Sequence, residues 1–140
     1  MAERDLKGLR VAILVDEDFE QVEMTEPRRA LDQAGADTVL ISLKPGKVQA
    51  FKNDEKGDRF PVDLVLDEAS PDDYEALLLP GGALNADRLR MELAAQEFVR
   101  TFDQDGKPMA VICHAPWLLV SGAAIGILLS RIRITRKKKS

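Results

Sequence analysis

The single cysteine and the single histidine of this chain are adjacent, as Cys113 and His114, in the stretch MAVICHAPW. They follow an apolar run, and Pro116 comes shortly after them, which is typical of a strand that turns sharply into a helix. A cysteine at the positive end of a helix has a stabilised thiolate, so its pKa falls below about 8.5 and it becomes reactive near neutral pH. His114 could act there as an acid or a base. The pair therefore indicates nucleophilic chemistry.

Two other groups could assist such a nucleophile. Gly81 and Gly82 follow the apolar run 76–79. The backbone N–H groups of a glycine pair can approach a ligand closely, so they could bind an oxyanion. Acidic residues gather in DEDFEQVEMTE (16–26), after the first apolar run. A carboxylic acid held beside the sulfur could donate a hydrogen bond to the thiolate or move a proton.

Each of these signals also has an ordinary structural interpretation. A lone cysteine is often an inert buried residue, a lone histidine is often a satisfied structural group, and Gly-Gly is commonly a turn. Acidic residues after a strand often form a solvated helix start, which the helix dipole favours. The placement of these residues at the ends of three strands is what favours a site. One cysteine and one histidine fall short of a metal-ligand set, and no phosphate-binding glycine motif is present, so we expect no metal and no nucleotide.

The elements that would position these residues alternate between strands and helices. Short apolar runs predict four buried strands, over residues 10–15, 38–42, 76–79 and 109–112. This alternation implies a mostly parallel sheet with helices on both faces. We expect a flavodoxin-like three-layer α/β/α sandwich. Ligands bind beyond the carboxyl ends of such strands, so the three chemical groups would meet there.

Local patterns predict the connecting elements. The run PRRALDQAGAD predicts a helix that stops at Gly35. The alternation in FPVDLVLDE (60–68) predicts a half-exposed antiparallel strand, after a hairpin turn in KNDEKGD. Ser70 and Pro71 predict the start of another helix. A further helix is expected to end at Gly106 and to bury one face, made of Leu93, Ala94, Phe98 and Phe102.

Composition limits the class of protein. The chain is 45% apolar and 31% charged, which is ordinary for a globular domain. One cysteine allows no intrachain disulfide, the charged N-terminus does not resemble a signal peptide, and no apolar run is long enough to span a membrane. We therefore expect a cytoplasmic protein with no membrane partner. Residues 121–140 carry six of the 20 Lys and Arg and none of the 24 Asp and Glu. The acidic remainder argues against a nucleic-acid partner.

Four stretches in this order resemble the ThiJ/PfpI superfamily, especially its PfpI-like bacterial branch: AILVDEDFEQVEMTEP, DYEALLLPGG, ADRLR and GKPMAVICHAPWLLVSG. This is the family of the parkinsonism-associated protein deglycase. The resemblance covers about residues 8–122. It implies a flavodoxin-like sandwich of the class I glutamine amidotransferase-like type, a homo-oligomer that is at least a dimer, and no metal or organic cofactor.

The resemblance also implies roles for particular residues. Cys113 matches the family's reactive cysteine, and Glu23 matches the glutamate that hydrogen-bonds the sulfur in protonated form. His114 matches the histidine beside the cysteine in PfpI-like members. Asp87 falls where those members place an acid that completes a Cys-His-acid set across a subunit interface. Gly82 and the backbone of His114 match the oxyanion site.

The function that the resemblance implies is that of a stress-protection hydrolase with Cys113 as its nucleophile. Its substrates would be glyoxal-type adducts, either a small carbonyl compound or a modified protein side chain. One alternative is an intracellular PfpI-type cysteine peptidase, which His114 and Asp87 favour. Another is a non-catalytic redox-sensing or chaperone-like stress protein, in which the cysteine is oxidised. A last alternative is an inactive truncated fragment.

The end of the chain departs from the family pattern. After WLLVSG the family continues with further strands and a closing helix, whereas SGAAIGILLSRIRITRKKKS becomes basic and simple. We expect a PfpI-like domain over residues 1–122 and an atypical basic tail over 123–140, produced by a frameshift or a premature stop. A natural short paralogue with a basic end is the alternative. Loss of the terminal elements would expose a sheet edge and apolar faces, so we expect poor solubility and question the activity of this chain.

Overall fold

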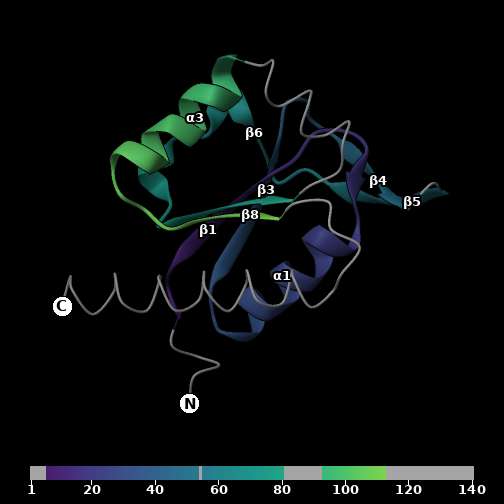
Figure 1. The fold of residues 1–140 in the computed structure, drawn as a ribbon, viewed down its shortest axis with the longest axis horizontal. Helices are drawn as coiled ribbons and strands as arrows, with labels where there is room; N and C mark the ends of the chain where they lie inside the picture. The colour runs from purple at the N-terminus through teal and green to yellow at the C-terminus, as the bar shows by residue number, and fades with distance from the viewer. Residues whose placement is uncertain (1–5, 54, 81–92, 113–140) are drawn as a thin grey trace.

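The computed structural model describes residues 6–53, 55–80 and 93–112 of the 140-residue chain. This part of the chain centres on a five-stranded sheet in which every pairing is parallel (Figure 1). The strands, in their order across the sheet, are β6 (Leu64–Val65), β3 (Asp37–Ser42), β1 (Arg10–Leu14), β7 (Ala76–Pro80) and β8 (Met109–Ile112). The four strands predicted from apolar runs are all present, and the short β6 is added at one edge.

Two helices cover opposite faces of the sheet, which gives the three layers that the sequence predicts. Helix α1 (Val22–Gln33) lies on one face and helix α3 (Leu93–Gln104) lies on the other (Figure 1). If the two-residue β6 is set aside, the remaining strands stand in the chain order 2-1-3-4 across the sheet. This is the order of the flavodoxin-like fold. The predicted fold class is therefore confirmed.

Strand β1 joins the two apolar cores of the molecule. Val11 and Ile13 are fully buried in the core that contains α1 residues, and Ala12 and Leu14 in the core that contains α3 residues. The alternation arises because successive side chains of a strand point to opposite faces of the sheet. Burial of a Leu or Ile side chain stabilises the folded state by about 1.5–3 kcal/mol relative to leaving it exposed. A strand covered on both faces has no polar side, which explains its continuous apolar sequence.

Helix α1 begins five residues before Pro27, earlier than the sequence pattern indicated, and Pro27 lies inside it. Proline has no N–H, so Pro27 cannot donate to the carbonyl of Glu23, four residues earlier. The first turn is therefore held less firmly to the rest of the helix than an ordinary first turn. The helix ends as predicted, because Gly35 follows it with a φ of +96° and donates to the Asp32 carbonyl at 3.0 Å.

A second sheet adjoins the connection between β1 and α1. Its strands, in spatial order, are β2 (Phe19–Glu20), β4 (Lys47–Lys52) and β5 (Glu55–Pro61). β4 and β5 form an antiparallel hairpin. A hairpin is predicted here, but its turn is shorter than KNDEKGD, because residues 55–58 of that stretch belong to β5. β2 pairs in parallel with β4, with Phe19 opposite Ala50 and Glu20 opposite Phe51. Because β2 lies between β1 and α1 in the chain, this hairpin contacts the segment that leads into α1.

The prediction of one antiparallel strand over residues 60–68 is wrong. Its first residues end β5, its middle residues form β6 in parallel with β3, and its last residues form the 3-10 helix η2 (Leu66–Glu68). The chain changes sheets because Asp63 is bound to β3. Its N–H donates to the Leu40 carbonyl (2.9 Å), and its carboxylate accepts the Leu40 N–H (2.8 Å).

The helix predicted to start at Ser70 and Pro71 is only a short turn. It is the three-residue 3-10 helix η3 (Pro71–Asp73), and Ser70 makes no side-chain capping hydrogen bond. Pro71 occupies the first helical position, where its missing N–H has no cost. Tyr74 then returns the chain to an extended conformation, with φ −128° and ψ 146°, directly before β7.

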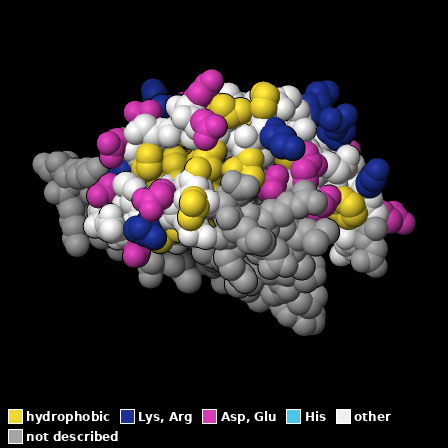
Figure 2. Space-filling model, turned by 90° about the horizontal axis from the view of Figure 1, so that it is seen from above, with side chains coloured by type: hydrophobic (Ala, Val, Ile, Leu, Met, Phe, Trp, Pro, Cys, Tyr) yellow, Lys and Arg dark blue, Asp and Glu magenta, His cyan; other side chains and the backbone are white. Residues whose placement is uncertain are grey.

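The buried face of α3 is shifted from the predicted face. Phe98 and Phe102 are buried as expected, but Leu93 is 76% exposed, Ala94 is exposed and Ala95 is buried. Residues 95, 98 and 102 follow one helical stripe toward the sheet, and the first two apolar residues lie off that stripe. Figure 2 shows apolar side chains exposed among acidic and basic ones on the side of the molecule that carries α3.

Candidate active site

Three neighbouring strands of the central sheet end at the same edge, as the sequence predicts. β1 lies beside β7, and β7 lies beside β8, all in parallel. Pro80, the last residue of β7, is the register partner of Ile112, the last residue of β8. β3 lies on the other side of β1, so the switch point of the sheet falls between β1 and β7. This is where open α/β sheets bind ligands.

Glu23 is the one predicted site residue that the structure describes. The other five lie outside the described residues: Cys113, His114, Asp87, Gly81 and Gly82. In the sequence, Gly81 follows directly on β7 and Cys113 follows directly on β8. The two strand ends that lead to these residues are adjacent, and the β1 end that leads to Glu23 is next to them.

Glu23 lies in the first turn of α1, in the connection that leaves the carboxyl end of β1. The residue is buried, with 3% of its surface exposed to solvent. Acidic side chains are seldom buried to this degree unless they are paired or hydrogen-bonded. The interpretation of this segment as a solvated helix start is therefore wrong for Glu23. It holds for Glu26, which is exposed and forms an ion pair with Arg29.

Two neighbouring acids bind backbone groups of the β4–β5 hairpin. Glu17 accepts the N–H of Gln49 at 3.0 Å. Glu20, which is also buried, accepts the N–H of Asn53 at 3.0 Å. Both bonds join the β1–α1 connection to the β4–β5 hairpin. The acidic segment therefore contains two residues that bind backbone groups of the hairpin, Glu17 and Glu20, and a further buried acid, Glu23, at the start of the helix.

Gln21 contacts the hairpin through both its backbone and its side chain. Its N–H donates to the Phe51 carbonyl of β4 at 2.8 Å. Its side chain donates from Nε2 to Asp58 Oδ2 (2.9 Å) and accepts the Asp58 N–H at Oε1 (2.8 Å). Its carbonyl accepts the N–H groups of Met24 (3.1 Å) and Thr25 (2.9 Å) in the first turn of α1. No sequence pattern pointed to Gln21, because its side-chain partner is 37 residues away.

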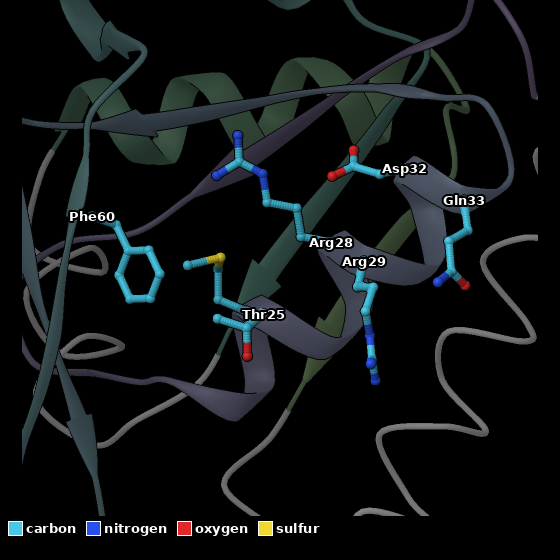
Figure 3. Close-up of a pocket in the computed structure, with 7 residues that line it drawn as sticks. Thr25, Arg28, Arg29, Asp32, Gln33 and Phe60 are labelled. Atoms are coloured by element: carbon cyan, nitrogen blue, oxygen red, sulfur yellow. The ribbon is translucent and has the colours of Figure 1, made fainter.

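An open groove of about 380 Å³ runs along α1, and Glu23 is not among its lining residues. Its lining residues are Met24, Thr25, Arg28, Arg29, Asp32, Gln33 and Phe60, and Figure 3 shows Phe60 across the groove from the helix. Both arginines are already engaged. Arg28 donates from Nε to Thr38 Oγ1 and from Nη2 to Asp63 Oδ2, each at 3.0 Å, and Arg29 pairs with Glu26. The groove therefore does not present a free cationic pair to an anion.

In the part of the chain that the structure describes, no three or more His, Cys, Asp or Glu side chains are placed to hold a metal ion. Glu17, Glu20 and Glu26 each engage a different partner, so their carboxylates do not converge on one point. Within the same described ranges, no helix has the length and apolar character to cross a membrane.

Known proteins resemble this chain in sequence. A family model described as the DJ-1/PfpI family matches residues 9–129. "Putative cysteine protease YraA" of Bacillus subtilis is 35% identical over 111 residues, which cover 79% of this chain and 63% of that protein. "Protein/nucleic acid deglycase 2" of Escherichia coli is 36% identical over 116 residues, which cover 83% of this chain and 66% of that protein.

Solved structures share the fold. The crystal structure of VC2308 protein matches with a TM-score of 0.69 at 26% identity, over 77% of this chain and 54% of that chain. The oxidised Toxoplasma gondii DJ-1 matches with a TM-score of 0.68 at 26% identity, over 82% of this chain and 62% of that chain. The chain spans less than two thirds of the length of each of these four relatives.

Proposed function

Because this chain belongs to the DJ-1/PfpI family, we propose that it is a cysteine-dependent hydrolase acting on glyoxal-type adducts, with Cys113 as nucleophile. The observation that carries the proposal is the burial of Glu23, in the connection that leaves β1 beside the ends of β7 and β8. The deglycase name of the Escherichia coli relative supports this substrate class. The substrate would be a small carbonyl compound or a modified protein side chain.

The proposed reaction begins when the thiolate of Cys113 adds to the aldehyde carbon of the substrate and forms a carbon–sulfur bond. The carbonyl oxygen becomes an oxyanion, which the N–H groups of Gly81, Gly82 and His114 would stabilise. A protonated carboxyl has an O–H donor, so Glu23 in that form would donate a hydrogen bond to the sulfur and favour the thiolate.

The second half of the reaction restores the thiol. For methylglyoxal, the proton on the former aldehyde carbon moves to the neighbouring carbon through an enediol, carried by His114. The aldehyde carbon is thereby oxidised to a thioester while the ketone is reduced to an alcohol. Water then cleaves the carbon–sulfur bond and releases lactate and the Cys113 thiol. In an amine adduct the same carbon is bonded to nitrogen, so its carbon–nitrogen bond breaks first: His114 protonates the leaving amine, and the aldehyde that forms is then attacked by the thiolate. No external oxidant or reductant is consumed.

The proposal includes self-association, because Asp87 of a second subunit would orient His114 and complete a Cys-His-acid set. The variants Asp87→Asn and Cys113→Ser test this arrangement. Each alone is expected to lose turnover. A refolded mixture is expected to regain part of it, since some mixed interfaces join an intact Asp87 to an intact Cys113. A mixture as inactive as its components would contradict a shared site.

A second candidate function is that of an intracellular cysteine peptidase. The name of the Bacillus subtilis relative supports it. The same thiolate and oxyanion donors would serve acyl transfer, with His114 protonating the amine that leaves. The two functions differ in their products: a glyoxal-type adduct yields a hydroxy acid, whereas a peptide is cleaved into two shorter chains.

The deciding experiment compares the full chain with Cys113→Ser. Methylglyoxal loss and lactate formation are measured together, and hydrolysis of a denatured protein is measured in parallel. Lactate formation that falls by at least about 10³-fold in the variant supports the hydrolase. Protein hydrolysis without lactate supports the peptidase. A reactive thiol with neither activity supports a redox-sensing or chaperone-like role and overturns the proposed function.

A further inference from the structure

We infer that Gln21 is a positioning residue for Glu23, acting through its contacts with the β4–β5 hairpin. The inference rests on the proposed function, in which Glu23 serves the sulfur of Cys113. It concerns residues outside the proposed catalytic set. What it adds is a link between a hairpin outside the central sheet and the acid at the sheet edge.

The start of α1 lacks the bonds that usually fix a first helical turn. A Ser, Thr, Asp or Asn side chain at the cap position ordinarily accepts N–H groups of that turn. The cap residue here is Gln21, and it makes no side-chain capping bond. On the other side of the turn, Pro27 has no N–H to donate to the Glu23 carbonyl. The contacts of Gln21 therefore help to fix the turn that carries Glu23.

Gln21 is held by both strands of the hairpin. Its N–H donates to β4, and its side-chain amide donates to and accepts from Asp58 of β5. Its carbonyl accepts the N–H groups of Met24 and Thr25, the two residues that follow Glu23 in the first turn. Hydrogen bonds through Gln21 thus connect the hairpin to the first turn of α1, which carries Glu23. A shift of Gln21 against the hairpin moves the first turn with it.

Gly57 shows that the hairpin leaves room for the Gln21 amide. A Cβ built on Gly57 would overlap Oε1 of Gln21, and its next neighbour, Cγ of Lys52, would be at 3.2 Å. The φ of Gly57 is not positive, so alanine is compatible with its backbone. The atom that must move is the end of a flexible side chain. Gly57→Ala therefore displaces the amide of Gln21 while leaving the glutamine in place.

The donor and the acceptor of the side-chain hydrogen bond between Gln21 and Asp58 can also be exchanged. Gln21→Glu removes the Nε2 donor and places a second carboxylate against Asp58. Adding Asp58→Asn returns a donor, because the asparagine amide can donate to the new glutamate and its backbone N–H is unchanged. Gln21→Glu alone therefore breaks the contact, and the double variant restores it with the two chemical groups exchanged.

The test measures two properties of the full chain: hydrogen exchange of the backbone amides in residues 22–25, and the rate of Cys113 alkylation by iodoacetamide across pH. The variants are Gln21→Ala, Gly57→Ala, Gln21→Glu and the exchanged pair. Glu23→Leu serves as the reference for loss of the acid. Gln104→Ala is the matched control, because Gln104 is exposed at the end of α3.

The three disrupting variants are expected to speed exchange in the first turn and to move the alkylation profile toward that of Glu23→Leu, by about threefold in rate near neutral pH. The exchanged pair is expected to restore both properties, and Gln104→Ala to change neither. An unchanged alkylation profile in the disrupting variants, with Glu23→Leu shifted, overturns the inference and leaves the proposed function standing. If Glu23→Leu leaves the alkylation profile unchanged, the proposed role of Glu23 is overturned, and the inference about Gln21 is overturned with it.

Discussion

Pro80 and Ile112 are register partners, and each is the last residue of its strand. β7 and β8 therefore end level with each other, beside the strand whose connection carries Glu23. In the sequence, the next residues are Gly81 and Cys113. The proposal that glycine amides and a thiol act on one carbonyl group depends on this shared edge.

Phe102→Ala is expected to lower the free energy of unfolding by about 3–5 kcal/mol. The side chain is fully buried, and its ring centroid lies 5.2 Å from that of Phe98. Leu93→Ala, in the same helix but 76% exposed, is expected to change stability by less than about 0.5 kcal/mol. Urea unfolding followed by circular dichroism measures both. Equal losses would contradict the buried face assigned to α3.

Tyr74→Phe is expected to raise the free energy of unfolding by about 1 kcal/mol at neutral pH. Tyr74 is 1% exposed, and its hydroxyl has no hydrogen-bond partner among the described residues. Phenylalanine keeps the ring contact with Phe98 and the guanidinium of Arg10, which lies 4.9 Å from the ring centroid. A variant that unfolds more readily than the parent would show that the hydroxyl contributes a favourable bond.

Tyr74 also predicts a loss of stability at alkaline pH. Burial raises the pKa of its phenol, against a smaller lowering effect of Arg10. The unfolded chain ionises this group at about pH 10, so above that value the folded state binds more protons and stability falls as the pH rises. Tyr74 is the single tyrosine, so phenolate absorbance reports it alone. We expect a titration midpoint above 10, and a weaker alkaline loss in Tyr74→Phe. A midpoint at or below 10 is the contrary result.

Gly35→Ala is expected to lower the free energy of unfolding by about 2 kcal/mol or more. Gly35 has a φ of +96°, and a Cβ there would lie 3.1 Å from the backbone nitrogen of Lys7. Gly8→Ala is the matched control, since Gly8 has a φ of +84° but nothing within 4 Å of the added carbon. It is expected to cost about 1 kcal/mol from backbone strain alone. Urea denaturation compares them, and equal costs would contradict the close approach of Lys7.

The central sheet was predictable because its strands are buried on both faces. A strand without a polar side reads as an uninterrupted apolar run, which identified β1, β3, β7 and β8. Their parallel arrangement followed from alternation with helices, and it brought three strand ends to one edge. The helix stops at Gly35 and Gly106 were also predictable, because each depends on one residue with a positive φ, +96° and +67°.

The remaining features depend on contacts between distant segments. FPVDLVLDE alternates like one strand, but the bonds of Asp63 to Leu40 divide it between two sheets. Leu93 is exposed because it lies off the side of α3 that packs against the sheet, and the sequence of the helix alone does not identify that side. Gln21 gains its role from Asp58, and nothing local links the two. For the site, Glu23 was predicted and is buried at the expected edge, whereas the roles of the five site residues outside the described ranges stay predictions.

The pH dependence of Cys113 alkylation tests most directly whether Glu23 tunes the sulfur. The chain has one cysteine, so the intact mass after iodoacetamide treatment reports this thiol alone. We predict a midpoint below the ordinary thiol value of about 8.5 in the native chain, and a rise of about one pH unit in Glu23→Leu. A midpoint near about 8.5 in both proteins would contradict a reactive cysteine supported by this glutamate.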